Sequence, residues 1–146
     1  MAAKVGGWTD CMRDPLTPMT GSSSEGRPVV AFVGRSGSGK TTLLLALVPE
    51  LVRRGVRLGV IKHSSHRGVE IDVPGSDTRR LWDAGAQEVA LVTPDRMMVS
   101  RQLEMEPPLR DAIDRLGDVD LVILEGYKRS AVPKIEVIRA ACTPLP

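Results

Sequence analysis

The chain has 146 residues, and its 20 lysines and arginines against 18 aspartates and glutamates leave a formal net charge of +2. This length fits one domain with a buried core, and so balanced a charge gives no reason to expect a nucleic acid or an anionic membrane as a partner. No apolar run approaches the length of a membrane span. Cys11 and Cys142 lie in opposite tails without metal-ligand spacing, so we expect a reduced, cytoplasmic protein.

The N-terminal segment differs from the rest of the chain. Residues 1–27 contain scattered Gly, Pro, Ser and Thr without apolar periodicity, which predicts a disordered tail. A functional tail and a tag-like or mis-assigned start fit this segment equally well. Residues 28–146 have the regular pattern of one folded domain.

The first regular element is an apolar strand over residues 29–33, followed at once by the glycine-rich run Gly34-Arg35-Ser36-Gly37-Ser38-Gly39-Lys40-Thr41 and an apolar helical stretch. This order is typical of a phosphate-binding P-loop. Glycines allow the backbone amides to converge on a polyphosphate at a helix N-terminus. We therefore expect Gly34, Gly37, Ser38 and Gly39 to surround the phosphates, Lys40 to reach the β and γ phosphates, and the Thr41 hydroxyl to bind Mg²⁺.

The remaining elements alternate between helices and strands. The pattern predicts a helix bent at Pro49 and ended by Gly55, a strand over 56–62, a polar loop over 63–75, a helix over 77–84 capped by Ser76, strands over 89–92 and 97–100, a helix from 107 to 116, a strand over 121–125 and an edge strand over 135–138. The strand over 121–125 has no polar face, which indicates burial on both sides. The fold class expected is α/β, a P-loop NTPase-type mostly parallel sheet with helices on both faces.

Glu125 ends that buried strand and resembles the acid of a Walker B motif. Ligands of open α/β sheets bind at the carboxyl ends of the strands, so Glu125 should lie near the P-loop and hold Mg²⁺ through water or orient an attacking water. The alternative is that Glu125 only satisfies backbone groups of the turn that follows it.

The loop after residue 62 contains both histidines of the chain and has three interpretations. In the first, His63, His66 and Asp72 are the ligands of a metal ion. In the second, the loop lies beside the triphosphate, and Asp72 or Asp77 reaches the Mg²⁺ shell. A solvated loop with ordinary surface histidines is the third.

A series of short motifs follows the P-loop. These motifs are Val60-Ile61-Lys62-His63, His66, Asp72, Pro74-Gly75, Asp77, Asp83-Ala84-Gly85-Ala86, Leu124-Glu125-Gly126-Tyr127-Lys128 and Pro133-Lys134-Ile135. Together with the P-loop, they resemble the molybdopterin-guanine dinucleotide biosynthesis protein B family, MobB. The resemblance covers about residues 28–140.

The resemblance implies a P-loop protein that binds GTP with Mg²⁺, hydrolyses it slowly, and assists the guanylyltransferase that makes molybdopterin guanine dinucleotide. It implies that the nucleotide contacts extend to Thr42. It places Thr41, Asp72 and Asp77 near the metal, and it makes Lys40 and Glu125 the catalytic residues. It also implies a homodimer, for which we expect a contact through Met97 and Val99. Members of the family continue through a base-contacting loop and a terminal helix with no counterpart before Pro146, so guanine specificity stays open.

A small kinase that transfers a γ-phosphoryl group to a metabolite is the alternative function. Such an enzyme needs an arginine-bearing lid and an acceptor-side base. The lid candidate is the short, proline-stiffened segment 104–110, so an accessory GTP-binding protein is the favoured interpretation.

Overall fold

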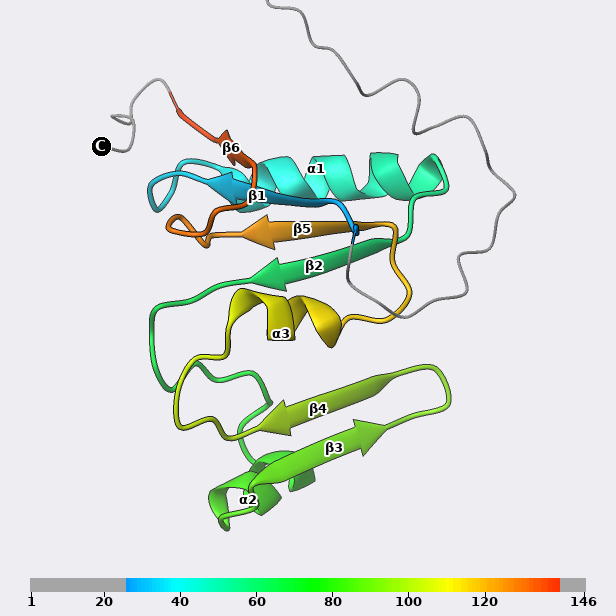
Figure 1. Cartoon of the computed structure of the whole chain (residues 1–146). Helices are drawn as coiled ribbons and strands as arrows, with labels where there is room; N and C mark the ends of the chain where they lie inside the picture. The colour runs from blue at the N-terminus through cyan, green and yellow to red at the C-terminus, as the bar shows by residue number, and fades with distance from the viewer. Residues whose placement is uncertain (1–25, 140–146) are drawn as a thin grey trace, which may run out of the picture.

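A parallel four-stranded sheet forms the centre of the molecule. The computed structural model describes residues 26–139 (Figure 1). The strand order is β2 (Leu58–Lys62), β5 (Leu121–Glu125), β1 (Val29–Val33) and β6 (Lys134–Glu136). Because all four strands run in the same direction, their carboxyl ends share one edge of the sheet, which is where ligands of such folds bind.

One helix covers each face of this sheet. On one face, α1 (Lys40–Arg53) packs Leu44 against Phe32 and Ile123. On the other face, α3 (Leu109–Asp114) packs Ile113 against a second set of strand residues. That set is Ala31, Val33, Val122 and Leu124. The side chains of β1 and β5 therefore alternate between two apolar cores, as burial on both faces requires.

The remaining elements form a smaller unit. Strands β3 (Glu88–Val92) and β4 (Met97–Arg101) pair with each other as an antiparallel hairpin, and α2 (Asp77–Asp83) contacts β3. In Figure 1 this unit lies on the far side of α3 from the parallel sheet. None of the residues in α2, β3 or β4 is fully buried, so this unit has little apolar core of its own.

The expected fold class is confirmed, with shifts at the ends of elements. The second strand begins at Leu58 rather than residue 56, because the amide of Val56 bonds the Leu51 carbonyl and that of Arg57 bonds the Asp120 carboxylate at 2.8 Å. These two residues therefore connect helix to strand. The edge strand spans residues 134–136 rather than 135–138, although the Val137 amide still donates to Val33.

Several local predictions are confirmed as well. Ser76 caps α2 by accepting a hydrogen bond from the Arg79 amide at 3.2 Å. As predicted, helix α1 ends before Gly55, which has a left-handed φ of 84°. Pro49 lies inside the helix, and the bend expected there stays a prediction. The expected tail over 1–27 lies, except for its last two residues, outside the described residues, as do both cysteines. Across residues 26–139, no helix is long and apolar enough to cross a membrane.

Candidate nucleotide-binding site

The glycine-rich loop leads from β1 into an open helix N-terminus. Gly39 is the N-cap of α1, with a φ of 95° and no side-chain cap. The Leu43 amide makes a helical hydrogen bond to the Gly39 carbonyl at 2.8 Å. The amides of Lys40, Thr41 and Thr42 precede that bond, so an α-helix offers them no acceptor. Together with the positive end of the helix dipole, they form a site for an anion.

The start of the loop is packed too closely for any residue but glycine. Gly34 has a φ of 147°, and a Cβ at this position would lie 2.5 Å from the Val137 carbonyl oxygen and 2.8 Å from the Ser38 hydroxyl. Ser38 is buried, and its hydroxyl has no hydrogen-bond partner within residues 26–139. Burying an unpaired hydroxyl is unfavourable, which fits a loop that is completed by a bound polar group.

Lys40 is held by the loop itself. Its ammonium donates to the carbonyl oxygens of Arg35 at 2.7 Å and Gly34 at 3.2 Å. These are neutral acceptors, so a polyphosphate would be a stronger partner for the same charge. The lysine is thus placed beside the anion site, and no carboxylate among residues 26–139 contacts its ammonium group.

Glu125 meets the P-loop at the end of β5. Its Oε1 accepts a hydrogen bond from the Thr41 hydroxyl at 2.8 Å and pairs with the Lys62 ammonium at 3.0 Å. Partial burial raises the pKa of this carboxyl, but the bonds from Thr41 and Lys62 and the nearby charge of Lys40 outweigh that effect and hold the pKa below its usual value. The carboxylate contacts the P-loop threonine, so the prediction that Glu125 lies near the P-loop is supported over a purely backbone role.

These groups surround one polar pocket of about 290 Å³. Its lining residues are Ser36, Gly37, Gly39, Lys40, Thr41, Thr42, Lys62, Glu125 and Arg139. Three of these side chains are cationic and one is anionic. The pocket therefore suits a multiply charged anion, and the Thr41 hydroxyl and Glu125 carboxylate are the oxygen ligands that Mg²⁺ prefers.

The sequence analysis gave no role to two charged pocket residues, Lys62 and Arg139, or to Ser36 of the loop. Lys62 is the last residue of β2 and stands opposite Glu125 in the strand register. Arg139 follows β6, and its guanidinium lies 3.6 Å from where a Cβ on Gly39 would be. Both positions are at the carboxyl edge of the sheet. Because ligands of open α/β sheets bind at this edge, the end of the predicted second strand would have identified Lys62 as a candidate.

The histidine loop does not form the metal centre considered above. No group of three or more His, Cys, Asp or Glu within residues 26–139 is arranged to hold a metal ion. His63 instead pairs with Glu106, with its Nε2 3.0 Å from Oε1, and its ring lies against Tyr127 at a centroid distance of 4.7 Å. The His63 amide also donates to the Glu125 carbonyl, which joins the ends of β2 and β5.

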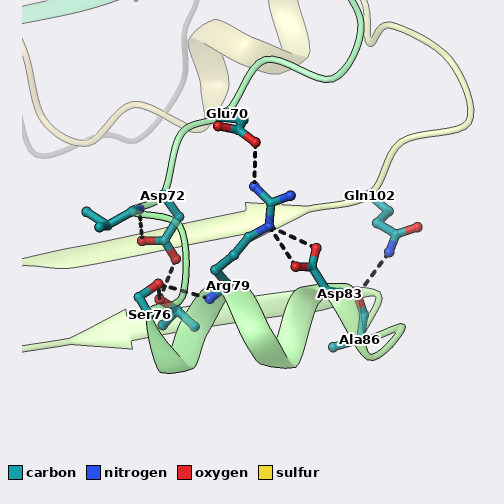
Figure 2. Close-up of polar contacts among 9 residues, drawn as sticks. Glu70, Asp72, Ser76, Arg79, Asp83, Ala86 and Gln102 are labelled. Atoms are coloured by element: carbon teal, nitrogen blue, oxygen red, sulfur yellow. Dashed lines mark hydrogen bonds and ion pairs between the residues drawn. The ribbon is translucent and has the colours of Figure 1, made fainter.

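Asp72 and Asp77 do not line the pocket. Figure 2 shows Asp72 at the turn before α2, where it accepts hydrogen bonds from the Val73 amide and the Thr78 hydroxyl. The Thr78 bond is the main cause of the lowered pKa of Asp72. Asp77 is 95% exposed at the first turn of α2, with Arg80 3.6 Å away. A Mg²⁺ role for either residue remains a prediction.

A parallel sheet flanked by helices, with a glycine-rich loop between the first strand and the first helix, defines a P-loop-type α/β protein. The family model described as MobB, molybdopterin guanine dinucleotide synthesis protein B, matches residues 29–145. The chain belongs to this family, as its sequence motifs predicted.

Individual relatives agree with this assignment. The chain is 40% identical over 126 residues to the molybdopterin-guanine dinucleotide biosynthesis adapter protein of Haemophilus influenzae, covering 82% of this chain and 68% of that protein. It is 38% identical over 116 residues to the Escherichia coli adapter protein, covering 77% and 66%. A crystal structure of a MobB homologue from Bacillus stearothermophilus matches with a TM-score of 0.56 and 28% identity, covering 77% of this chain and 64% of that one. The chain thus spans about two thirds of the length of these relatives.

Proposed function

We propose that this chain is a GTP-binding accessory protein of molybdopterin guanine dinucleotide biosynthesis. In this role it assists the guanylyltransferase that forms the dinucleotide, and it hydrolyses GTP slowly with Mg²⁺. The observation that carries the proposal is the contact of Thr41 with Glu125 beside the open N-terminus of α1, in a chain of the MobB family.

Each group of the pocket has a distinct part in this function. The amides at the start of α1 bind phosphate oxygens, and Lys40 moves from the carbonyls of the loop to the β and γ phosphates. Mg²⁺, bound at the Thr41 hydroxyl and near Glu125, would neutralise charge on those phosphates. The Glu125 carboxylate also orients an attacking water, because it is ionised at neutral pH.

The kinase alternative has less support. In the segment 104–110, which was expected to form a lid, Glu106 contacts the His63 ring. The Arg110 guanidinium lies 3.9 Å from the Asp114 carboxylate. Neither Glu106 nor Arg110 lines the pocket. An arginine that closes over a transferring phosphate would have to leave its present partner first.

Equilibrium binding tests the proposal directly. We expect wild-type protein to bind GTP more tightly than ATP and to bind GTP more tightly with Mg²⁺ than with EDTA, as measured by calorimetric titration. Equal affinity for the two nucleotides would contradict the guanine preference. Binding of neither nucleotide would contradict the proposed function.

We also propose a homodimer formed through the β3–β4 hairpin. The hairpin exposes a row of apolar side chains, with Met97 72%, Val99 47% and Val92 70% exposed. Neither strand has another partner in the part of the chain that the structure describes, so both hairpin edges are available for pairing. A second copy would bury these side chains, which a unit with little core of its own requires for stability.

Charging this surface should separate the subunits. The double variant Met97→Lys, Val99→Glu is expected to sediment as a monomer where wild type sediments as a dimer, because taking charged side chains out of water into an apolar interface is strongly unfavourable. Leu45→Lys with Val52→Glu makes the same changes at exposed positions of α1 and should leave the dimer intact. A monomeric wild type at high concentration would exclude the dimer.

A further inference from the structure

We propose that the ammonium group of Lys62 contacts the terminal phosphate of a bound nucleoside triphosphate, so that the pocket prefers a triphosphate to a diphosphate. The inference rests on the proposed nucleotide binding and adds a residue that distinguishes a triphosphate from a diphosphate. Lys62 lies outside the glycine-rich loop and comes from a different strand of the sheet.

The position of Lys62 is set by strand pairing. It is the last residue of β2 and stands opposite Glu125 in the parallel ladder. Its Nζ lies 3.0 Å from Glu125 Oε1, and its side chain is 63% exposed and lines the pocket together with Lys40. An ammonium group has three N–H donors, and the bond to Glu125 uses one of them. The others are available to an anion in the pocket.

The strand order indicates which end of the phosphate chain Lys62 faces. The P-loop follows β1, with β5 and β2 on one side and β6 on the other. Mg²⁺ held at the Thr41 hydroxyl would neutralise charge on the β and γ phosphates, so the terminal phosphate is expected on the side of Thr41 and Glu125. Lys62 is on this side, whereas Arg139 follows β6 on the opposite side.

The balance of charge favours a direct contact. Without Lys62, the Glu125 carboxylate would face the terminal phosphate with like charge, which is unfavourable in a partly desolvated pocket. A lysine bonded to the carboxylate offsets that repulsion and keeps donors for the phosphate oxygens. The phosphate chain of a diphosphate ends before it reaches Lys62, so the charge of this lysine contributes much less to its affinity.

Titrations with a non-hydrolysable GTP analogue and with GDP test the inference. We expect Lys62→Met to raise the Kd for the triphosphate about tenfold, the range of one charged hydrogen bond, and to change the Kd for GDP by less than about twofold. Lys62→Arg should recover most of the loss. Arg53→Met is the matched control, because it removes one positive charge at the far end of α1 from the pocket. Glu50 still pairs with Arg54 in this variant, and neither Kd should change.

A second measurement separates direct contact from an effect through Glu125. In a Glu125→Gln background, Lys62→Met should still weaken triphosphate binding, because the lysine acts on the phosphate itself. Loss of the effect in that background would overturn the inference, as would equal weakening of both nucleotides or no change in either. A wild-type protein that binds neither nucleotide would overturn the proposed function and this inference together, whereas wild-type binding with an unaffected Lys62→Met variant would overturn the inference alone.

Discussion

Replacing Lys40 with alanine is expected to raise the Kd for GTP by about thirtyfold or more, because removing one partner of a desolvated charge pair costs about 2 kcal/mol or more. The Lys40 ammonium donates to two loop carbonyls, which are neutral acceptors, so its charge is available to the phosphates. Lys40 also stands at the first turn of α1, where it supplements the backbone amides with a full positive charge. Calorimetric titration with GTP and Mg²⁺ measures the loss.

The fold should survive this substitution. Water can replace the lysine at the exposed carbonyl of Arg35, and truncating a side chain at the pocket rim opens no cavity in either apolar core. Lys134→Ala is a matched control, because this lysine is on β6 outside the pocket and should leave GTP affinity unchanged. Native far-UV circular dichroism with unchanged GTP affinity in Lys40→Ala would contradict the assignment of the P-loop.

The parts of the site that the sequence predicted are those with a local pattern. The glycine spacing from Gly34 to Thr41 determines the loop and the helix start without reference to the rest of the chain. The position of Glu125 also followed, because an apolar strand without a polar face must lie inside a parallel sheet and end at its carboxyl edge. Local periodicity likewise predicted the strands over 89–92 and 97–100.

The remaining features depend on contacts between distant segments. Lys62 and Glu125 are 63 positions apart, and only the pairing of β2 with β5 brings them together. Period-two alternation predicts a strand but not its partner, so the separation of the hairpin from the parallel sheet could not be inferred. The bonds of Asp72 to the Val73 amide and the Thr78 hydroxyl were also not predicted, because residue type alone does not show which local groups a carboxylate accepts from. Its expected role near Mg²⁺ stays a prediction.

Replacing Glu125 with glutamine should reduce GTP hydrolysis on the order of tenfold or more while binding is retained or tightened. The Oε1 of glutamine can still accept from Thr41 and Lys62, so the geometry at the end of β5 is kept and the negative charge is lost. Without that charge the residue orients an attacking water less effectively, whereas the repulsion between residue 125 and the phosphates disappears.

Single-turnover hydrolysis with saturating GTP and Mg²⁺ separates this catalytic effect from any change in affinity. Glu88→Gln is the matched control, since this glutamate lies on β3 outside the pocket, bonded to Arg101, and its loss should leave the rate unchanged. The substitution at residue 125 also removes the negative charge that pairs with Lys62, so we expect the affinity for GTP to rise by more than the affinity for GDP. An undiminished rate in Glu125→Gln would mean that the carboxylate positions Thr41 and Lys62 without taking part in hydrolysis.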